Sequence, residues 1–295
     1  MQPDVAERLV LGTAQLCKEY GVTNRFGPPA RREIFDLLSF AWDSGIKRYD
    51  TAPVYGSESV LGEFLGAHGV SDVARISTKL PGISNNHEFE KEITFAVKES
   101  LRQLGGAIDV YFFHRPEDSS LLLKCPEFFQ ELTRKYPIET IGVSVYSLSE
   151  TEDLRSLWGQ VAFQYPLSFA DRRFEDLELT PGRNYARSVF LQGLLVSVSC
   201  LNERIPQQLS KFHKRYHEVL RYHRVDPVSF ALTYILNCNM VNYFVIGVER
   251  LEQVRKIIAT PLLEYSEFQR VAADLPMLPV DCHDPRNWGT GGSKL

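Results

Sequence analysis

Short apolar runs alternate with amphipathic segments along most of the chain. The strand-like runs lie near residues 9, 47, 75, 109, 140, 161, 188 and 243, the seventh of them covering 187–195. Between most of them lie longer segments whose apolar positions share one face of a helix, such as 29–45 and one long segment at 206–237. The pattern therefore predicts eight strands with helices between most of them.

Strict alternation of strands and helices favours a parallel sheet. Eight such units within 295 residues fit an α/β fold of the (β/α)8 TIM-barrel type better than an open, doubly wound sheet. No linker or block of charge interrupts the chain. We therefore predict one barrel domain at residues 1–278 and an irregular C-terminal tail at 279–295.

Overall charge gives no reason to expect a nucleic-acid or membrane partner. The net charge is −4 and the pI is about 6.0. The five cysteines are scattered without a C-x-x-C pair, as expected of free thiols in a reducing compartment. We see neither a signal peptide nor a run of about 18 apolar residues that could span a membrane. The sequence thus predicts a cytoplasmic enzyme or binding protein, and it specifies no oligomeric state.

Four ionisable side chains follow the second, third and fourth apolar runs. Asp50 ends the second run, Tyr55 lies in the loop after it, Lys79 ends the third run and His114 ends the fourth. In a (β/α)8 barrel the reactive groups lie at the carboxyl ends of the strands. We therefore expect an acid, a phenol, an amine and an imidazole around one mouth. Asp50 and Lys79, taken alone, could equally be a structural ion pair.

Together these four groups can act as a tuned general acid. A tyrosine titrates near 10, and a nearby lysine ammonium, held by the aspartate, lowers that pKa. The histidine can hydrogen-bond a substrate oxygen. No nucleophilic Ser or Cys stands beside a base, and a single carboxylate does not make a glycosidase pair. Since no side chain supplies a hydride, a nicotinamide cofactor is implied.

Several stretches of the chain resemble the aldo-keto reductase family. They are LGTAQ (11–15), DTAPVYGSE (50–58), STKL (77–80), SLRQLGGAIDVYFFHRPED (100–118), IGVSVYS (141–147), FQYPLS (163–168), ARSVFLQGLL (186–195) and VIGVERLEQV (245–254). Asp50, Tyr55, Lys79 and His114 match the four positions of the family's catalytic tetrad. The resemblance implies reduction of a small aldehyde or ketone, with Tyr55 as the proton donor, Lys79 lowering its pKa and His114 orienting the carbonyl.

The resemblance also implies where the cofactor binds. Ser144 and Gln164 match positions that hold the nicotinamide carboxamide, and 247–250 opens the helix whose N-terminus meets the adenosine phosphates. NADP(H) is favoured over NAD(H). The full set of expected cofactor contacts is Gly12, Thr13, Asp50, Ser144, Gln164, Arg187, Gly247, Arg250 and Gln253.

Some positions depart from the family's usual pattern. Val145 stands where Asn commonly follows Ser144, and Arg187 stands where an aromatic ring often stacks on the nicotinamide. Glu249 lies in the adenosine 2′-phosphate pocket, where it would repel a phosphate, and Gln253 stands where an Arg is common. Arg187 could contact the nicotinamide, the pyrophosphate or an anionic group of the substrate.

Two other roles stay open. Some members of the family bind the cofactor as sensor or regulatory subunits with little turnover, and the departures are compatible with this. The stretch LGTAQLCKEYGVTN (11–24) resembles a bacterial subgroup linked with the synthesis of surface polysaccharides or nucleotide sugars. In that setting Arg115 or Arg187 could meet a phosphate or carboxylate of the substrate.

His213 and His217 lie four residues apart, a spacing that can hold zinc. The segment around them is strongly polar and no H-E-x-x-H pattern is present. We therefore expect a solvated helix face here, with no metal and no nucleic acid.

Overall fold

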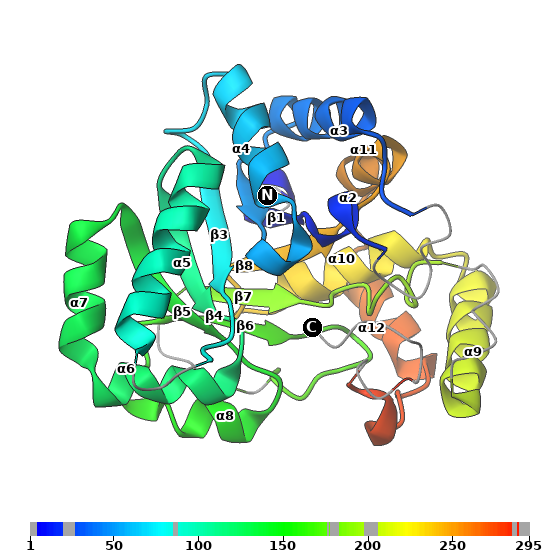
Figure 1. Cartoon of the computed structure of the whole chain (residues 1–295). Helices are drawn as coiled ribbons and strands as arrows, with labels where there is room; N and C mark the ends of the chain where they lie inside the picture. The colour runs from blue at the N-terminus through cyan, green and yellow to red at the C-terminus, as the bar shows by residue number, and fades with distance from the viewer. Residues whose placement is uncertain are drawn as a thin grey trace.

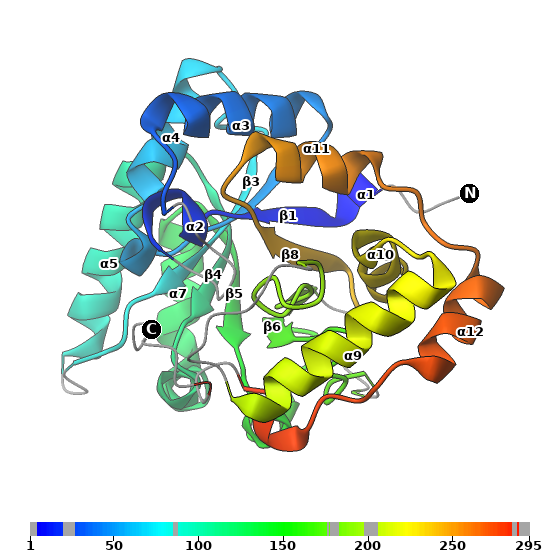
Figure 2. The ribbon, with the colours of Figure 1, turned by 90° about the vertical axis from the view of Figure 1, so that its right-hand side faces the viewer.

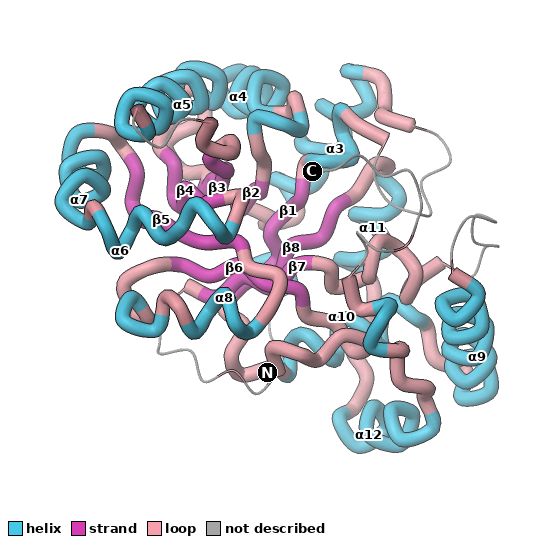
Figure 3. The backbone as a smooth tube through the Cα atoms, turned by 60° about the horizontal axis from the view of Figure 1, so that its bottom comes forward, coloured by secondary structure: helices cyan, strands magenta, loops and turns pink. Residues whose placement is uncertain are grey.

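A closed barrel of eight parallel strands forms the centre of the molecule, a computed structural model. The structure describes residues 5–19, 27–84, 88–175, 177, 183–197, 206–284 and 288. Within these residues each strand pairs with the next, and β8 closes the ring by pairing with β1. Figure 3 shows the strands in the middle with helices around them. The predicted (β/α)8 barrel is confirmed.

Most elements lie close to their predicted positions. The strands are β1 Leu9–Gly12, β2 Arg48–Asp50, β3 Arg75–Leu80, β4 Ile108–Phe113, β5 Ile138–Ser144, β6 Ala162–Pro166, β7 Asn184–Arg187 and β8 Tyr243–Gly247. The helices are α1 Val5–Arg8, α2 Ala14–Cys17, α3 Arg31–Asp43, α4 Glu58–Ala67, α5 Phe89–Leu104, α6 Leu121–Lys124, α7 Pro126–Lys135, α8 Leu148–Glu152, α9 Gln207–His223, α10 Pro227–Asn237, α11 Leu251–Ala259 and α12 Tyr265–Asp274. Helices α3 and α11, which are far apart in the sequence, pack side by side (Figure 1).

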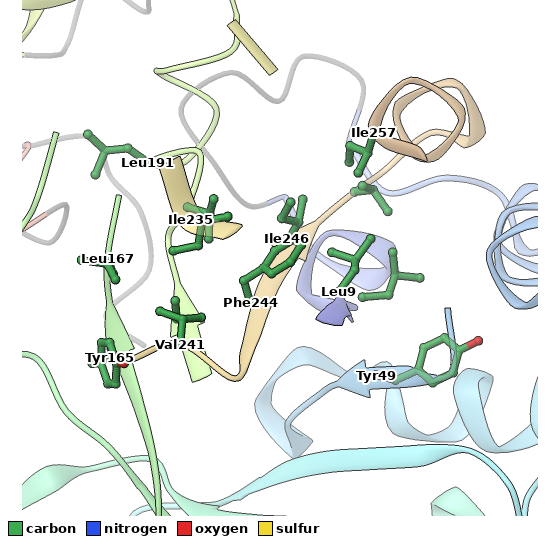
Figure 4. Packing of buried hydrophobic residues seen from close by; sticks show 14 of the residues in the cluster. Leu9, Tyr49, Tyr165, Leu167, Leu191, Ile235, Val241, Phe244, Ile246 and Ile257 are labelled. Atoms are coloured by element: carbon green, nitrogen blue, oxygen red, sulfur yellow. The ribbon is translucent and has the colours of Figure 1, made fainter. Parts of the chain in front are cut away.

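Alternating strand residues build two layers of core. Val10, Val110 and Phe112 belong to a small cluster inside the barrel, whereas Phe244 and Ile246 belong to the larger cluster between the strands and the helices. Figure 4 shows part of that larger cluster at β8. Because successive strand residues point to opposite faces, one short strand serves both layers. Full burial of each such side chain contributes about 1.5–3 kcal/mol.

The seventh strand differs from the prediction. It covers Asn184–Arg187, and most of the expected run 187–195 folds instead as successive turns. Ser188, Leu191 and Gln192 have φ values of 60°, 47° and 53°, which a sheet ladder does not accept. Val189, Leu191, Leu194 and Leu195 are nevertheless buried in the larger cluster. Figure 2 shows the turns, in yellow-green, between β8 and α9.

The long helical segment predicted at 206–237 is two helices. Arg224 caps the C-terminus of α9 with a left-handed φ of 59°, and Asp226 is the N-cap of α10. The Asp226 carboxylate accepts hydrogen bonds from the backbone N–H groups of Val228 and Ser229, and Pro227 occupies the first position of α10. These local signals break the apolar periodicity that otherwise runs through both helices.

Part of the C-terminal segment is packed against the barrel domain. A 3-10 turn covers Val280–Cys282, and the buried indole of Trp288 donates a hydrogen bond to the Cys282 carbonyl at 2.9 Å. Residues 285–287 and 289–295 lie outside the described residues, so the predicted division at residue 278 stays a prediction. Cys17, Cys125, Cys238 and Cys282 are free thiols, and Cys200 also lies outside the described residues. Among the described helices, none is long and apolar enough to cross a membrane.

The amino-terminal end of the barrel holds an ion-pair network. The buried Asp109 carboxylate at the start of β4 accepts hydrogen bonds from Arg183 at 2.9 Å and from Arg48 at 3.2 Å. Arg75 and Arg183 also pair with Glu139. In barrels of this type, groups at this end serve stability rather than chemistry.

Candidate active site

The carboxyl ends of the strands open into a cavity of about 560 Å³. Its walls come from several strand ends, the turns after β7, and α11. Of the residues singled out from the sequence as catalytic or cofactor-binding, Arg250 alone does not line it. Those that do are Gly12, Thr13, Asp50, Tyr55, Lys79, His114, Ser144, Gln164, Arg187, Gly247 and Gln253.

Asp50 and Lys79 form a buried ion pair at the floor of the cavity. The Lys79 ammonium lies 2.5 Å from Oδ1 of Asp50 and also donates to the Thr51 carbonyl at 3.0 Å. The second oxygen, Oδ2, accepts hydrogen bonds from Ser77 at 3.1 Å and Gln164 at 2.8 Å. The carboxylate therefore has three side-chain donors, which compensate for its removal from water.

Tyr55 and His114 face each other beside this pair. Tyr55 ends the 3-10 turn Pro53–Tyr55, and Gly56 follows with a left-handed φ of 73° that turns the chain into α4. The Tyr55 and His114 ring centroids lie 6.2 Å apart, edge to face. The Lys79 ammonium lies 5.1 Å from the Tyr55 ring centroid. The four residues predicted as a tetrad therefore meet at one place.

The surroundings of Tyr55 and His114 favour their neutral forms. Burial raises the pKa of the Tyr55 phenol, Asp50 raises it further, and Arg187 lowers it. The net shift is upward, rather than the downward shift expected from Lys79, because burial penalises the phenolate more strongly. Burial, followed by the Lys79 charge, lowers the pKa of His114 to about 4. At neutral pH Tyr55 is therefore an uncharged phenol and His114 an uncharged imidazole.

Ser144 and Gln164 lie side by side at the ends of β5 and β6, where they are paired in register. Both are buried and line the cavity. The Gln164 amide is already engaged, since its Nε2 donates to Asp50. Its carbonyl end is the part available to a bound amide, and Ser144 adds a hydroxyl beside it.

Two glycines allow a close approach to the backbone at the β1–β8 seam. Gly12 and Gly247 are register partners, and a Cβ on Gly12 would lie 3.3 Å from the Gly247 backbone. A Cβ on Gly247 would meet the Gln15 side chain at 2.2 Å. Gln15, which the sequence analysis did not single out, also lines the cavity. The missing side chains therefore let β1 and β8 lie close together and make room for Gln15 at the cavity.

The N-terminus of α11 carries both attractive and repulsive groups for a phosphate. The Gln253 side-chain oxygen accepts from the backbone N–H groups of Glu249 at 2.8 Å and Arg250 at 3.1 Å. Those amides are therefore already satisfied. Glu249 is buried, and burial raises the pKa of its carboxyl while Arg250 lowers it. Lys256 also lines the cavity but pairs with Asp226 at 2.9 Å.

Arg187 is held in place by its neighbours at the end of β5. Its Nη2 donates to the Val145 carbonyl at 3.0 Å, and its guanidinium carbon lies 4.1 Å from the Tyr146 ring centroid. Val145 itself is fully buried and has an apolar side chain. Where the family pattern has Asn, only the backbone of this chain can therefore make a hydrogen bond. Tyr146 lines the cavity, although the sequence analysis gave it no role.

The turns after β7 supply residues that the sequence analysis also missed. Ser188, Val189, Phe190, Gln192, Gly193, Val196 and Ser197 line the cavity. Their apolar run predicts a strand, whereas the structure has turns there. The sequence signal for a turn in this run is the glycine at position 193, which has a left-handed φ of 89° in the structure.

His213 and His217 do not lie on a solvated face. Both are buried, and their Nε2 atoms lie 2.7 Å and 3.0 Å from the carbonyl oxygens of Ser197 and Leu194. The expectation of a solvated face was wrong for these two residues because α9 packs on the turns after β7. No group of three or more His, Cys, Asp or Glu side chains within the described ranges could hold a metal ion.

A sequence profile described as "Aldo/keto reductase family" matches residues 8–273. The aldo-keto reductase YhdN of Bacillus subtilis is 29% identical over 199 residues, which cover 64% of this chain and 59% of that relative. A D-threo-aldose 1-dehydrogenase of a Pseudomonas species is 27% identical over 278 residues, covering 79% of this chain and 84% of the relative. Over its alignment with the first of these, the chain thus spans about three fifths of the relative's length.

Solved structures show the same fold at lower identity. A glycerol dehydrogenase of Gluconobacter oxydans superposes with a TM-score of 0.69 at 22% identity, covering 94% of this chain and 92% of that chain. The holo form of an aldo-keto reductase of Bacillus halodurans gives 0.69 at 20% identity, covering 94% and 95%.

Proposed function

The chain belongs to the aldo/keto reductase family of NAD(P)-dependent oxidoreductases acting on carbonyl or alcohol groups, and from this premise we propose that it reduces an aldehyde or ketone with Tyr55 as proton donor. The observation that carries the proposal is the meeting of Tyr55, His114 and the Asp50–Lys79 pair in one cavity. A nicotinamide cofactor supplies the hydride when it is bound.

Tyr55 and His114 would together hold the carbonyl oxygen of the substrate. Burial keeps the phenol of Tyr55 protonated at neutral pH, so it has a proton to donate. His114 is neutral as well, and one nitrogen of a neutral imidazole is a hydrogen-bond donor. Two donors aimed at one oxygen orient the carbonyl and stabilise the negative charge that develops on it.

Lys79 would stabilise the phenolate that Tyr55 leaves after giving up its proton. Its ammonium faces the Tyr55 ring and is fixed by Asp50 and the Thr51 carbonyl. A preorganised cation needs little reorganisation during the reaction. Asp50 therefore acts through Lys79, and Ser77 and Gln164 act through Asp50 by holding its second oxygen.

The residues of the cavity fit a dinucleotide. Gly12, Thr13 and Gly247 line the cavity at the β1–β8 seam, and the Thr13 hydroxyl donates a hydrogen bond to the backbone carbonyl of Asp50. Ser144 and the carbonyl end of Gln164 would hold the nicotinamide amide. Gln253 and Lys256 line the α11 end, where the adenosine phosphates would lie.

We propose that NADP(H) is preferred to NAD(H). Arg250 supports this choice because it puts a positive charge at the α11 end, where the charge of Lys256 is already paired with Asp226. Glu249 opposes it, since a buried carboxylate near a 2′-phosphate is repulsive. Binding constants for NADPH and NADH, measured by cofactor fluorescence, decide between them. A tighter constant for NADH would overturn the preference.

Sugars and polyols are the substrate class that the relatives suggest. Two similar proteins are called a D-threo-aldose 1-dehydrogenase and a glycerol dehydrogenase. The opening stretch 11–24, which resembles a bacterial subgroup linked with sugar pathways, points the same way. We therefore propose a sugar-like aldehyde or ketone as the substrate.

Loss of NADPH absorbance with a panel of aldehydes and sugar aldehydes tests the reductase activity. Wild type is compared with Tyr55→Phe, which keeps the ring and removes the proton. We expect Tyr55→Phe to lose at least about 100-fold in turnover, the usual contribution of a positioned acid. Tyr222→Phe is the matched control, because Tyr222 is 82% exposed and does not line the cavity.

Cofactor binding separates loss of chemistry from loss of fold. Tyr55→Phe should bind NADPH as wild type does. Full turnover by Tyr55→Phe would overturn the assignment of the proton donor.

A dinucleotide-binding sensor with little turnover is the second candidate. Arg187 and Val145, which replace the family's usual aromatic residue and Asn, favour it because they change the nicotinamide end of the site. Tight NADPH binding by wild type, without oxidation by any carbonyl in the panel, would support this role over the first.

A further inference from the structure

We propose that the substrate carries an anionic group, a carboxylate or a phosphate, which binds the guanidinium of Arg187 beside the reacting carbonyl. This inference rests on the proposed reductase function and narrows its substrate class. Arg187 lines the same cavity as Tyr55 and His114.

Arg187 presents a fixed guanidinium rather than a flexible chain. One of its nitrogens, Nη2, donates to the Val145 carbonyl, and its plane is supported by the Tyr146 ring at 4.1 Å. Its Nε is buried and has no hydrogen-bond partner. An arginine always carries its charge, and its donors form a planar fork that matches carboxylate and phosphate oxygens. The side chain is thus preorganised and only partly satisfied.

The charges that line the cavity leave Arg187 uncompensated. Lys79 is neutralised by Asp50 at 2.5 Å, Lys256 pairs with Asp226 at 2.9 Å, and the carboxylate of Glu249 lies at the α11 end, where the nearby charge is Arg250. Among the described residues, no acidic side chain forms an ion pair with Arg187. A partly buried cation without an anion is costly, and a bound anion offsets that cost.

The position of Arg187 points to the substrate rather than to the cofactor phosphates. Its charge acts on both Tyr55 and His114, lowering the pKa of each. The phosphates of a dinucleotide are expected at the N-terminus of α11, where Gln253 and Lys256 line the cavity. The nicotinamide ring adds no negative charge of its own. An anion at Arg187 therefore belongs to the molecule whose carbonyl meets Tyr55.

Arg115 adds a second positive charge at the same end. It follows His114 directly and lowers the pKa of that histidine. Its guanidinium lies across Gly82, where a Cβ would come within 2.2 Å of its Cζ. Arg115 is exposed and does not line the cavity, so we assign it to attraction of the anion rather than to its binding.

Matched pairs of aldehydes test the proposal. Butyraldehyde and succinic semialdehyde differ by a carboxylate, and glyceraldehyde and glyceraldehyde 3-phosphate differ by a phosphate. With saturating NADPH, we expect wild type to show a kcat/KM about tenfold or more higher for at least one charged member than for its neutral partner. The pair that shows the effect identifies the anion.

Two substitutions of Arg187 separate charge from shape. Arg187→Met should lower kcat/KM for the charged aldehyde by about 10- to 100-fold more than for the neutral aldehyde, whose own change measures the effect of the lost charge on Tyr55 and His114. Arg187→Lys should recover only part of the loss, because a lysine lacks the planar fork. Arg102→Met is the control for lost charge, since Arg102 is exposed on α5 and pairs with Glu99.

A binding measurement keeps this inference separable from the reductase function. Glycerol 3-phosphate and glycerol are titrated calorimetrically into the protein loaded with NADP⁺, and 4-hydroxybutyrate and butan-1-ol form the carboxylate pair. Tighter binding of an anionic member, lost in Arg187→Met, supports the anion site even where no aldehyde is reduced. Failure of wild type to oxidise NADPH or NADH with any aldehyde counts against the reductase alone.

Three results would overturn the inference. One is equal use and equal binding of charged and neutral compounds by wild type. Another is an equal loss for both classes in Arg187→Met. The third is a rise in the NADPH dissociation constant in that variant without a change in substrate preference, which would make Arg187 a cofactor residue.

Discussion

Substituting Asp50 and substituting Lys79 should both lower the free energy of unfolding, but by different amounts. Their side chains are 7% and 3% exposed, so each substitution leaves a buried charge behind. Breaking a buried pair by removing one partner typically costs about 3–5 kcal/mol. The perturbations are Asp50→Asn, Lys79→Met and the double variant.

The hydrogen bonds around the pair set the order of the two losses. After Lys79→Met, the Asp50 carboxylate still accepts from Ser77 and Gln164. After Asp50→Asn, the Lys79 ammonium keeps the Thr51 carbonyl and the neutral Asn oxygen. We expect about 3–5 kcal/mol for Asp50→Asn and about 2 kcal/mol for Lys79→Met. The double variant should lose less than the sum, because no buried charge remains.

Thermal unfolding followed by far-UV circular dichroism measures these losses. At about 2 °C per kcal/mol for a chain of this size, Asp50→Asn should lower the Tm by roughly 6–10 °C. Urea unfolding of the same proteins gives the coupling energy of the double-mutant cycle, which we expect to exceed about 1 kcal/mol. Additive losses, or a larger loss for Lys79→Met, would refute the reasoning.

Three further predictions concern packing, the cofactor and pH. Gly62→Ala would place a Cβ 2.0 Å from the Gln103 carbonyl oxygen, so we expect the free energy of unfolding, measured in urea, to fall by about 2–3 kcal/mol. Gly66→Ala on the same helix is the control, because a Cβ there meets nothing within 4 Å. Equal effects of the two substitutions would contradict this prediction. Glu249→Gln removes a buried carboxylate from the α11 end and should tighten NADPH about tenfold relative to NADH by fluorescence titration; an unchanged ratio would exclude Glu249 from the 2′-phosphate site. The folded-state pKa of His114 is about 4, below its unfolded value of about 6.5, so its stabilising contribution is complete above pH 6.5 and is lost as the pH falls toward 4. Between pH 7 and pH 5 wild type should therefore lose about 2 kcal/mol more in urea unfolding than His114→Gln, and equal losses would refute the shifted pKa.

The sequence predicts the barrel well because its strands are short, apolar and regularly spaced. It misplaces β7 for a physical reason. Hydrophobicity reports that Val189, Leu191 and Leu194 are buried, but not that they are buried in turns. The strand itself includes Asn184 and Arg187, whose polar side chains conceal it. The hydrophobicity of this run therefore predicts its burial but not its backbone conformation.

The tetrad is predictable because each member ends or follows a strand. Side-chain partners are harder to predict. The sequence predicts Gln164 at the nicotinamide amide but does not reveal that its Nε2 also donates to Asp50. His213 was expected in solvent and is buried against Ser197. Both outcomes depend on which segment packs opposite, and a periodic pattern within one segment carries no such information.

The two ends of the barrel deal with buried charge differently. At the amino-terminal end, Asp109 is shared by Arg48 and Arg183, so its charge is fully paired and serves the fold. At the carboxyl end, Asp50 neutralises Lys79, while Arg187 donates a hydrogen bond to the Val145 carbonyl but has no counter-ion among the described residues. An unpaired cation reduces stability where it stands. Its presence beside Tyr55 is understandable if the missing counter-ion arrives with the substrate, which is why charge, more than shape, should distinguish the substrates of this site.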